Sequence, residues 1–252
     1  MRKRSLLALL AVLVVTTVGA AWSKYRGPFA TAWHGVDGIH AAAVGALGAH
    51  EGKDAGPHMR MTAPRAARAG DAARAAGIAA AARRAVEKYR DYRAALRDGY
   101  EILLPHVPQK MYHFNNLRHY AEAERRFDAT RPTSLLYEKG GAEYRLIGVM
   151  YTAPAGLTED GLDERIPLSV AAWHQHVNVC LPQGDPLRNL FGGGPGFGLD
   201  GSISTEAECR EAGGRFYPRL FGWMVHLYPY ERTPREMWSV ERQMSGGSGH
   251  AH

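Results

Sequence analysis

The stretch Leu168-Ser-Val-Ala-Ala-Trp-His-Gln-His-Val-Asn-Val-Cys180 decides the fold, because it has the length and the Val-rich composition of a β-strand. In a strand, residues two apart project from the same face, so His174 and His176 would lie on one side about 6–7 Å apart. Two other short apolar stretches carry His226 and His113. The sequence therefore predicts a sheet that presents several histidines, which is the pattern of a metal site.

The residue pattern changes along the chain from helical to extended. Between Ala63 and Tyr100, Ala, Arg, Glu and Lys dominate, and the larger residues recur at steps of three and four. Beyond Pro132 the β-branched and aromatic residues dominate instead. Helices followed by consecutive strands indicate an α+β fold with a mainly antiparallel sheet, and a small, partly open barrel is the alternative. The expected strands are Thr133–Glu138, Glu143–Thr152, Leu168–Cys180 and Phe221–Tyr230, with a turn at Gly140-Gly141 and short helices at Leu117–Phe127 and within Asp200–Gly214. In the helical part, Gly70-Asp71 predicts a break and restart with Asp71 as N-cap, and Gly99 is expected to end the helix in the left-handed conformation. In the helix within Asp200–Gly214, Glu208 lies at capping-box distance from Thr205.

The N-terminus has the composition of an export signal. Arg2-Lys3-Arg4 precede an uncharged stretch up to Ser23, and Gly19-Ala20-Ala21 provide the small residues expected near a cleavage site. We expect residues 1–22 to be a signal peptide, with an uncleaved N-terminal anchor as the alternative. Either one places the protein in the periplasm, at the cell surface or outside the cell. A membrane is expected as a partner only through an uncleaved N-terminal segment.

Composition also predicts the domain organisation. Residues 23–60 are rich in Gly, Ala and His and indicate a flexible linker, with low-affinity metal scavenging as the alternative. Residues 61–243 are expected to form a single α+β domain, and residues 244–252 a flexible tail. The net charge of +6 includes the three cations near the N-terminus, and the other arginines are scattered among alanines. No nucleic-acid partner is therefore expected.

The chain contains two cysteines, Cys180 and Cys209. In an oxidising compartment an even pair predicts a disulfide, here one that closes a loop rich in Gly and Pro. Thiolate ligation of the metal is the weaker alternative, because Cys209 falls in a polar, helical stretch.

The histidines favour a transition metal over calcium or magnesium, because imidazole suits transition metals such as zinc and copper, whereas calcium and magnesium take oxygen ligands. We expect His113, His174, His176 and His226 to bind one copper or zinc ion, since same-face imidazoles buried without partners would leave polar groups unsatisfied. Met224 lies two residues before His226, and its thioether favours copper. The competing interpretation is a set of hydrogen-bonded core histidines.

Two further residues are candidates for roles around the metal. His119 and Glu138 could act as additional ligands or as hydrogen-bond acceptors for the ligating imidazoles.

Several motifs, in this order along the chain, resemble a family of uncharacterised exported bacterial proteins. That family has a helix ending in Asp-Gly-Tyr, a Met-x-His-[Tyr/Phe] motif, a Pro-x-x-Leu-x-Tyr-Glu motif and a late Trp/His strand. The resemblance carries no known activity, and it implies that His113, His174 and His176 occupy recurring motif positions. The pair His174/His176 is also similar to the His-x-His of cupins, although the glycine and glutamate spacing of cupins is missing. The stretches that carry the family resemblance are Tyr89–Tyr100, Met111–Asn115, Arg131–Glu138, Leu146–Tyr151 and Trp173–His176.

Three functions remain open from the sequence. The first is an exported, histidine-rich metal-binding protein of the bacterial cell envelope that stores, transfers or senses copper or zinc. The second is a metal-dependent hydrolase or oxygen-using enzyme, in which an open coordination position activates water or dioxygen and Glu138 acts as base. The third is a small-ligand or structural module without a metal.

Overall fold

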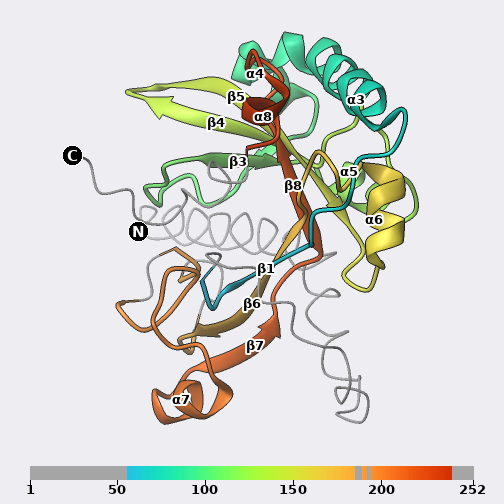
Figure 1. Cartoon of the computed structure of the whole chain (residues 1–252). Helices are drawn as coiled ribbons and strands as arrows, with labels where there is room; N and C mark the ends of the chain where they lie inside the picture. The colour runs from blue at the N-terminus through green and yellow to red at the C-terminus, as the bar shows by residue number, and fades with distance from the viewer. Residues whose placement is uncertain (1–55, 185–188, 192–193, 240–252) are drawn as a thin grey trace, which may run out of the picture. The chain divides into compact units, whose positions relative to one another are not determined.

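An open, antiparallel sheet of eight strands forms the centre of the part that the computed structural model describes, residues 56–184, 189–191 and 194–239. The strand order is β1-β6-β8-β5-β4-β3-β2, and β7 pairs with the far part of β6. Helices and an unclosed antiparallel sheet confirm the predicted α+β class (Figure 1). The expected signal peptide, most of the expected linker and the whole of the expected tail lie outside the described residues. The strands are β1 (Met59–Met61), β2 (Glu101–Ile102), β3 (Tyr112–Asn115), β4 (Ser134–Gly140), β5 (Glu143–Ala153), β6 (His174–Leu181), β7 (Arg215–Arg219) and β8 (Trp223–Leu227).

Helices cover one face of this sheet, and apolar side chains lie between the two layers. Ala75, Ile78 and Ala82 of α3 are buried in the same cluster as Val149 and Leu227 of the central strands. The residues spaced three and four apart, from which the helix was predicted, are thus the ones that pack against the sheet. The helical elements are α3 (Asp71–Val86), the 3-10 turn η1 (Glu87–Arg90), α4 (Tyr92–Arg97), α5 (Leu117–Ala123), α6 (Glu159–Arg165), α7 (Glu206–Glu211) and α8 (Pro234–Met237).

The helical stretch is less continuous than the sequence suggested. Its start is confirmed at the Gly70-Asp71 break, although Gly70 is the capping residue and Asp71 is the first helical one. The backbone of Asp91 is extended, and its side chain accepts a hydrogen bond from the backbone N–H of Arg93, so a new helix starts there. Gly99 ends this second helix at a φ of 84°, the left-handed conformation expected of it.

The predicted hairpin is confirmed by β4 and β5, which pair from Ser134↔Met150 to Gly140↔Glu143. Gly141 in the turn has a φ of 62°, a conformation that glycine adopts without strain.

The strand expected over 168–180 begins only at His174. The preceding residues form a turn, in which the backbone N–H groups of Val170 and Ala171 both donate to the carbonyl of Pro167. The backbone N–H of Leu168 donates to a carboxylate oxygen of Asp163 at 2.8 Å. Pro167 and these local bonds stop the strand, because they direct the backbone groups away from any ladder. The apolar residues of this turn still face the core, which explains the misleading pattern.

Residues 59 and 60, which the sequence analysis assigned to the linker, already belong to the sheet. Met59, Arg60 and Met61 pair with His176, Gln175 and His174 of β6. Arg60 stacks its guanidinium over the ring of Trp223, 5.2 Å from the centroid, on the opposite face from these histidines.

The predicted disulfide between Cys180 and Cys209 is present and joins the end of β6 to α7. The expected capping box of α7 is also confirmed, with Thr205 and Glu208 bonding reciprocally. The disulfide is consistent with an exported protein. Among the described residues, no helix is both long enough and apolar enough to cross a membrane.

Candidate histidine site on the sheet

Strand pairing brings the histidines of three strands to one face of the sheet, which we call the histidine face. His174 of β6 lies opposite Met224 of β8, and Met224 and His226 are two residues apart on that strand. Because paired residues of antiparallel strands share a face, His174 and His226 point to the same side. His113 of β3 is opposite Leu136, which packs with Met224 in a cluster on this face.

The four imidazoles form a row in the order His176, His174, His226, His113. The ring centroids of successive pairs are 5.6, 5.3 and 5.8 Å apart. Two imidazoles that bind one tetrahedral metal through bonds near 2 Å have centroids roughly 5 Å apart. Each neighbouring pair of the row is therefore spaced as metal ligands are.

The middle of the row is more deeply buried than its ends. His174 and His226 expose 2% and 4% of their surface, whereas His113 and His176 are partly exposed. The Nδ1 atoms of His113 and His226 are shielded from solvent, and neither has a hydrogen-bond partner among the described residues. A buried, unpaired polar atom costs about 1–3 kcal/mol, so these two nitrogens indicate a need for a partner.

Burial keeps three of these imidazoles neutral, those of His113, His176 and His226. Burial lowers the pKa of His113 to about 4, even though part of its surface is exposed. Burial, followed by the electrostatic effects of His174 and His113, lowers the pKa of His176 to about 3. The pKa of His226 is lowered well below its usual value, again mainly by burial. Neutral imidazole is the form that binds metals, so no proton has to leave these three rings near pH 7.

The rings do not yet converge on one point. Within the described residues, no group of three or more His, Cys, Asp or Glu side chains has its donor atoms placed to hold a metal ion. The planes of His174 and His226 are perpendicular, at 90°, as are nearly those of His174 and His176, at 84°. Binding of one ion would therefore require these side chains to reorient.

The two other candidates lie apart from this row. The carboxylate of Glu138, near the exposed turn of the hairpin, forms an ion pair with Arg145. The Nδ1 atom of His119 is 2.9 Å from the carbonyl oxygen of Pro132 and 3.2 Å from the hydroxyl of Tyr100, which belongs to the core on the helical side.

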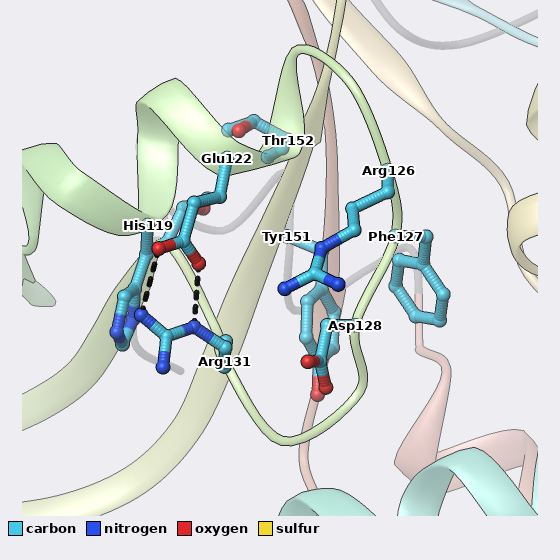
Figure 2. A pocket seen from close by; sticks show the side chains of 10 residues that line it. His119, Glu122, Arg126, Phe127, Asp128, Arg131, Tyr151 and Thr152 are labelled. Atoms are coloured by element: carbon cyan, nitrogen blue, oxygen red, sulfur yellow. Dashed lines mark hydrogen bonds and ion pairs between the residues drawn. The ribbon is translucent and has the colours of Figure 1, made fainter.

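A small pocket surrounds His119 and has room for about one water molecule (Figure 2). Its most prominent feature is the ion pair of Glu122 with Arg131, whose two contacts measure 2.6 and 2.9 Å. The hydroxyl of Thr152, which also lines the pocket, is buried without a partner among the described residues. With so little space, this pocket fits a structural water better than a substrate.

Sequence reasoning missed the methionines that β1 places beside the histidines. Met59 lies opposite His176, and Met61 lies opposite His174. The Met-Arg-Met pattern has the period of two that marks a strand, but three residues in a stretch rich in Gly and His give too short a signal.

His58, which the sequence placed in the linker, is a buried structural residue. Its Nδ1 lies 3.0 Å from the carbonyl oxygen of Asn178, and its Nε2 lies 2.7 Å from that of Gly201. Both ring nitrogens of His58 thus have hydrogen-bond partners, unlike the Nδ1 atoms of His113 and His226.

Comparison of the chain with protein-family models, with curated proteins and with solved structures gives no match. The function is therefore argued from the geometry of the histidine face.

Proposed function

We propose that this protein is an exported metal-binding protein of the bacterial cell envelope that holds one copper or zinc ion with His113, His174, His176 and His226. The observation that carries the proposal is the pair of neighbouring imidazoles of His113 and His226, whose Nδ1 atoms are shielded from solvent and lack partners among the described residues. A metal ion would satisfy these nitrogens, and the neutral rings would bind it without losing protons.

Further support comes from the spacing of the rings. Histidines more than about 8 Å apart could not share an ion through bonds near 2 Å, and each neighbouring pair of rings here is 5.3–5.8 Å apart, so each such pair meets this limit. The disulfide supports the exported location, since such bonds persist in oxidising compartments. The four ligands come from three strands that are distant in the sequence, so binding would also stabilise the fold.

The test is a calorimetric titration of the full-length protein, purified without a polyhistidine tag, with Zn²⁺ and separately with Cu(I). We expect one equivalent to bind in the wild type and none in the His174→Ala/His226→Ala variant, with near-ultraviolet circular dichroism confirming that the variant is folded.

The matched control removes three histidines that precede the described residues. A His34→Ala/His40→Ala/His50→Ala variant should retain the full equivalent. Loss of binding in this control with retention in the sheet variant would assign the metal to the N-terminal tract and overturn the proposal. Absence of binding in the wild type would leave a hydrogen-bonded histidine core.

A further inference from the structure

The histidine face carries methionines directly opposite three of its four histidines. Met61 and Met224 flank His174 on its two neighbouring strands. Met59 is opposite His176. In directly paired positions of an antiparallel sheet the Cβ atoms are about 4.5–5.5 Å apart, which brings each thioether within reach of the paired imidazole.

The same arrangement continues toward the other end of the row. Met150 of β5 is opposite His226 and is only 4% exposed. Met111, two residues before His113, packs against the cluster formed by Met150 and its neighbours, with its sulfur 4.0 Å from the hydroxyl of Tyr228. Five of the eight methionines of the chain thus lie on this face: Met59, Met61, Met111, Met150 and Met224.

Packing alone does not account for this distribution. Methionine often fills irregular gaps in cores, yet the larger core on the helical side of the sheet is built from Ala, Leu, Val, Tyr and Trp. Among the described methionines, only Met237 contacts that core. The methionines are gathered where the unpartnered imidazole nitrogens are.

Carboxylates are absent from the paired positions around the histidines. Besides methionine, these positions carry Leu136, Ser134, Thr152, Asn115 and Gly148. A doubly charged ion buried here would have no anionic ligand to balance it, whereas a singly charged ion carries a smaller desolvation cost. Thioether sulfur is a soft donor that selects Cu(I), and imidazole also suits copper.

From these register pairs we infer that the ion of this site is Cu(I), held in a small coordination shell that takes some of its ligands from the imidazoles of the row and the others from the thioethers of Met61, Met150 and Met224. The inference rests on the proposed metal-binding function and names its ion and its sulfur donors. Sulfur ligation would hold copper in the reduced state, so the site is suited to storing or transferring cuprous ions.

The test compares the affinities of the full-length protein for Cu(I) and Zn²⁺, each measured by competition with a chromophoric chelator. Cu(I) is maintained anaerobically with ascorbate, so that no thiol reductant opens the disulfide. The variant is Met61→Leu/Met150→Leu/Met224→Leu, which nearly conserves side-chain volume. The control is Met237→Leu, on the helical side of the sheet.

We expect the triple variant to bind Cu(I) at least ten-fold more weakly and Zn²⁺ within two-fold of the wild type, while Met237→Leu changes neither. X-ray absorption of the Cu(I)-loaded wild type should show copper–sulfur scattering that the triple variant loses. A wild type that binds Zn²⁺ more tightly than Cu(I), or a triple variant with unchanged Cu(I) affinity, overturns this inference while leaving the metal site intact. A wild type that binds neither ion overturns the proposed function itself.

Discussion

Replacing His226 by leucine should stabilise the metal-free protein, a result opposite to that expected of a structural core histidine. His226 is 4% exposed, lies in a central strand, and has an Nδ1 atom without a partner among the described residues. Such an atom costs about 1–3 kcal/mol. Leucine has a similar volume and no polar atom, so little packing is lost.

We therefore expect the free energy of unfolding of metal-free His226→Leu to rise by about 1–2 kcal/mol, since part of the gain is offset by imperfect packing. For a domain of this size, each kcal/mol corresponds to a shift of about 2–4 °C in Tm. The assay is urea denaturation and thermal melting in the presence of a chelator, repeated after addition of metal. Metal should stabilise the wild type and leave the variant unchanged.

His119→Leu is the matched control, because it makes the same chemical change at a hydrogen-bonded imidazole. The Nδ1 atom of His119 lies 2.9 Å from the carbonyl oxygen of Pro132, and loss of that hydrogen bond should lower stability by about 0.5–1.5 kcal/mol. The reasoning is refuted if metal-free His226→Leu is destabilised as His119→Leu is, because the imidazole of His226 would then be a satisfied part of the core.

The remaining predictions concern pH, the disulfide and the close contact of Gly148 with β8. In the folded state the pKa values of His113 and His176 are lowered to about 4 and about 3, so the unfolded chain takes up protons first as the pH falls. The free energy of unfolding should be complete above about pH 6.5 and should fall toward pH 3, by up to about 1.4 kcal/mol per pH unit for each histidine. A free energy of unfolding in urea that does not change between about pH 6.5 and 4 would contradict this. A Cys180→Ser/Cys209→Ser variant should lose about 3–4 kcal/mol in denaturant unfolding, because the bond closes a loop with a sequence separation of 29; a loss below 1 kcal/mol would show that the reduced loop stays ordered. Gly148→Ala should cost about 1–3 kcal/mol and weaken metal binding, since its Cβ would lie 2.8 Å from a backbone oxygen of β8; unchanged Tm and affinity would argue against that close contact.

The sequence predicted best where local chemistry determines the structure. The hairpin of β4 and β5, the cap of α7 and the Cys180–Cys209 pair follow from turn glycines, a Thr-x-x-Glu pattern and an even cysteine count. The end of the helical segment at Gly99 also follows from local chemistry, because glycine readily adopts the left-handed conformation that ends a helix.

Prediction was weaker where tertiary contacts override local pattern. The turn after Pro167 buries Leu168, Ala171 and Trp173 without forming a strand, so burial alone gave the appearance of one. The short strand β1 depends on pairing with β6, which no three-residue pattern reveals.

Of the candidate site, the sequence predicted the facing pair His174 and His176, because their spacing alone determines that they share a face. Whether His226 and His113 lie near this pair depends on the order of the strands in the sheet, which the hydrophobic pattern does not encode. Met59 and Met61 depend further on the register of β1 against β6.

The most direct measurement is the metal content of the full-length protein, purified without a polyhistidine tag. Elemental analysis by mass spectrometry would be made on the wild type and on the His174→Ala/His226→Ala variant, with the folded state of each verified. The account predicts about one equivalent of a single transition metal in the wild type and none in the variant. A wild type without metal, whose Tm does not change on addition of Cu(I) or Zn²⁺, would contradict it.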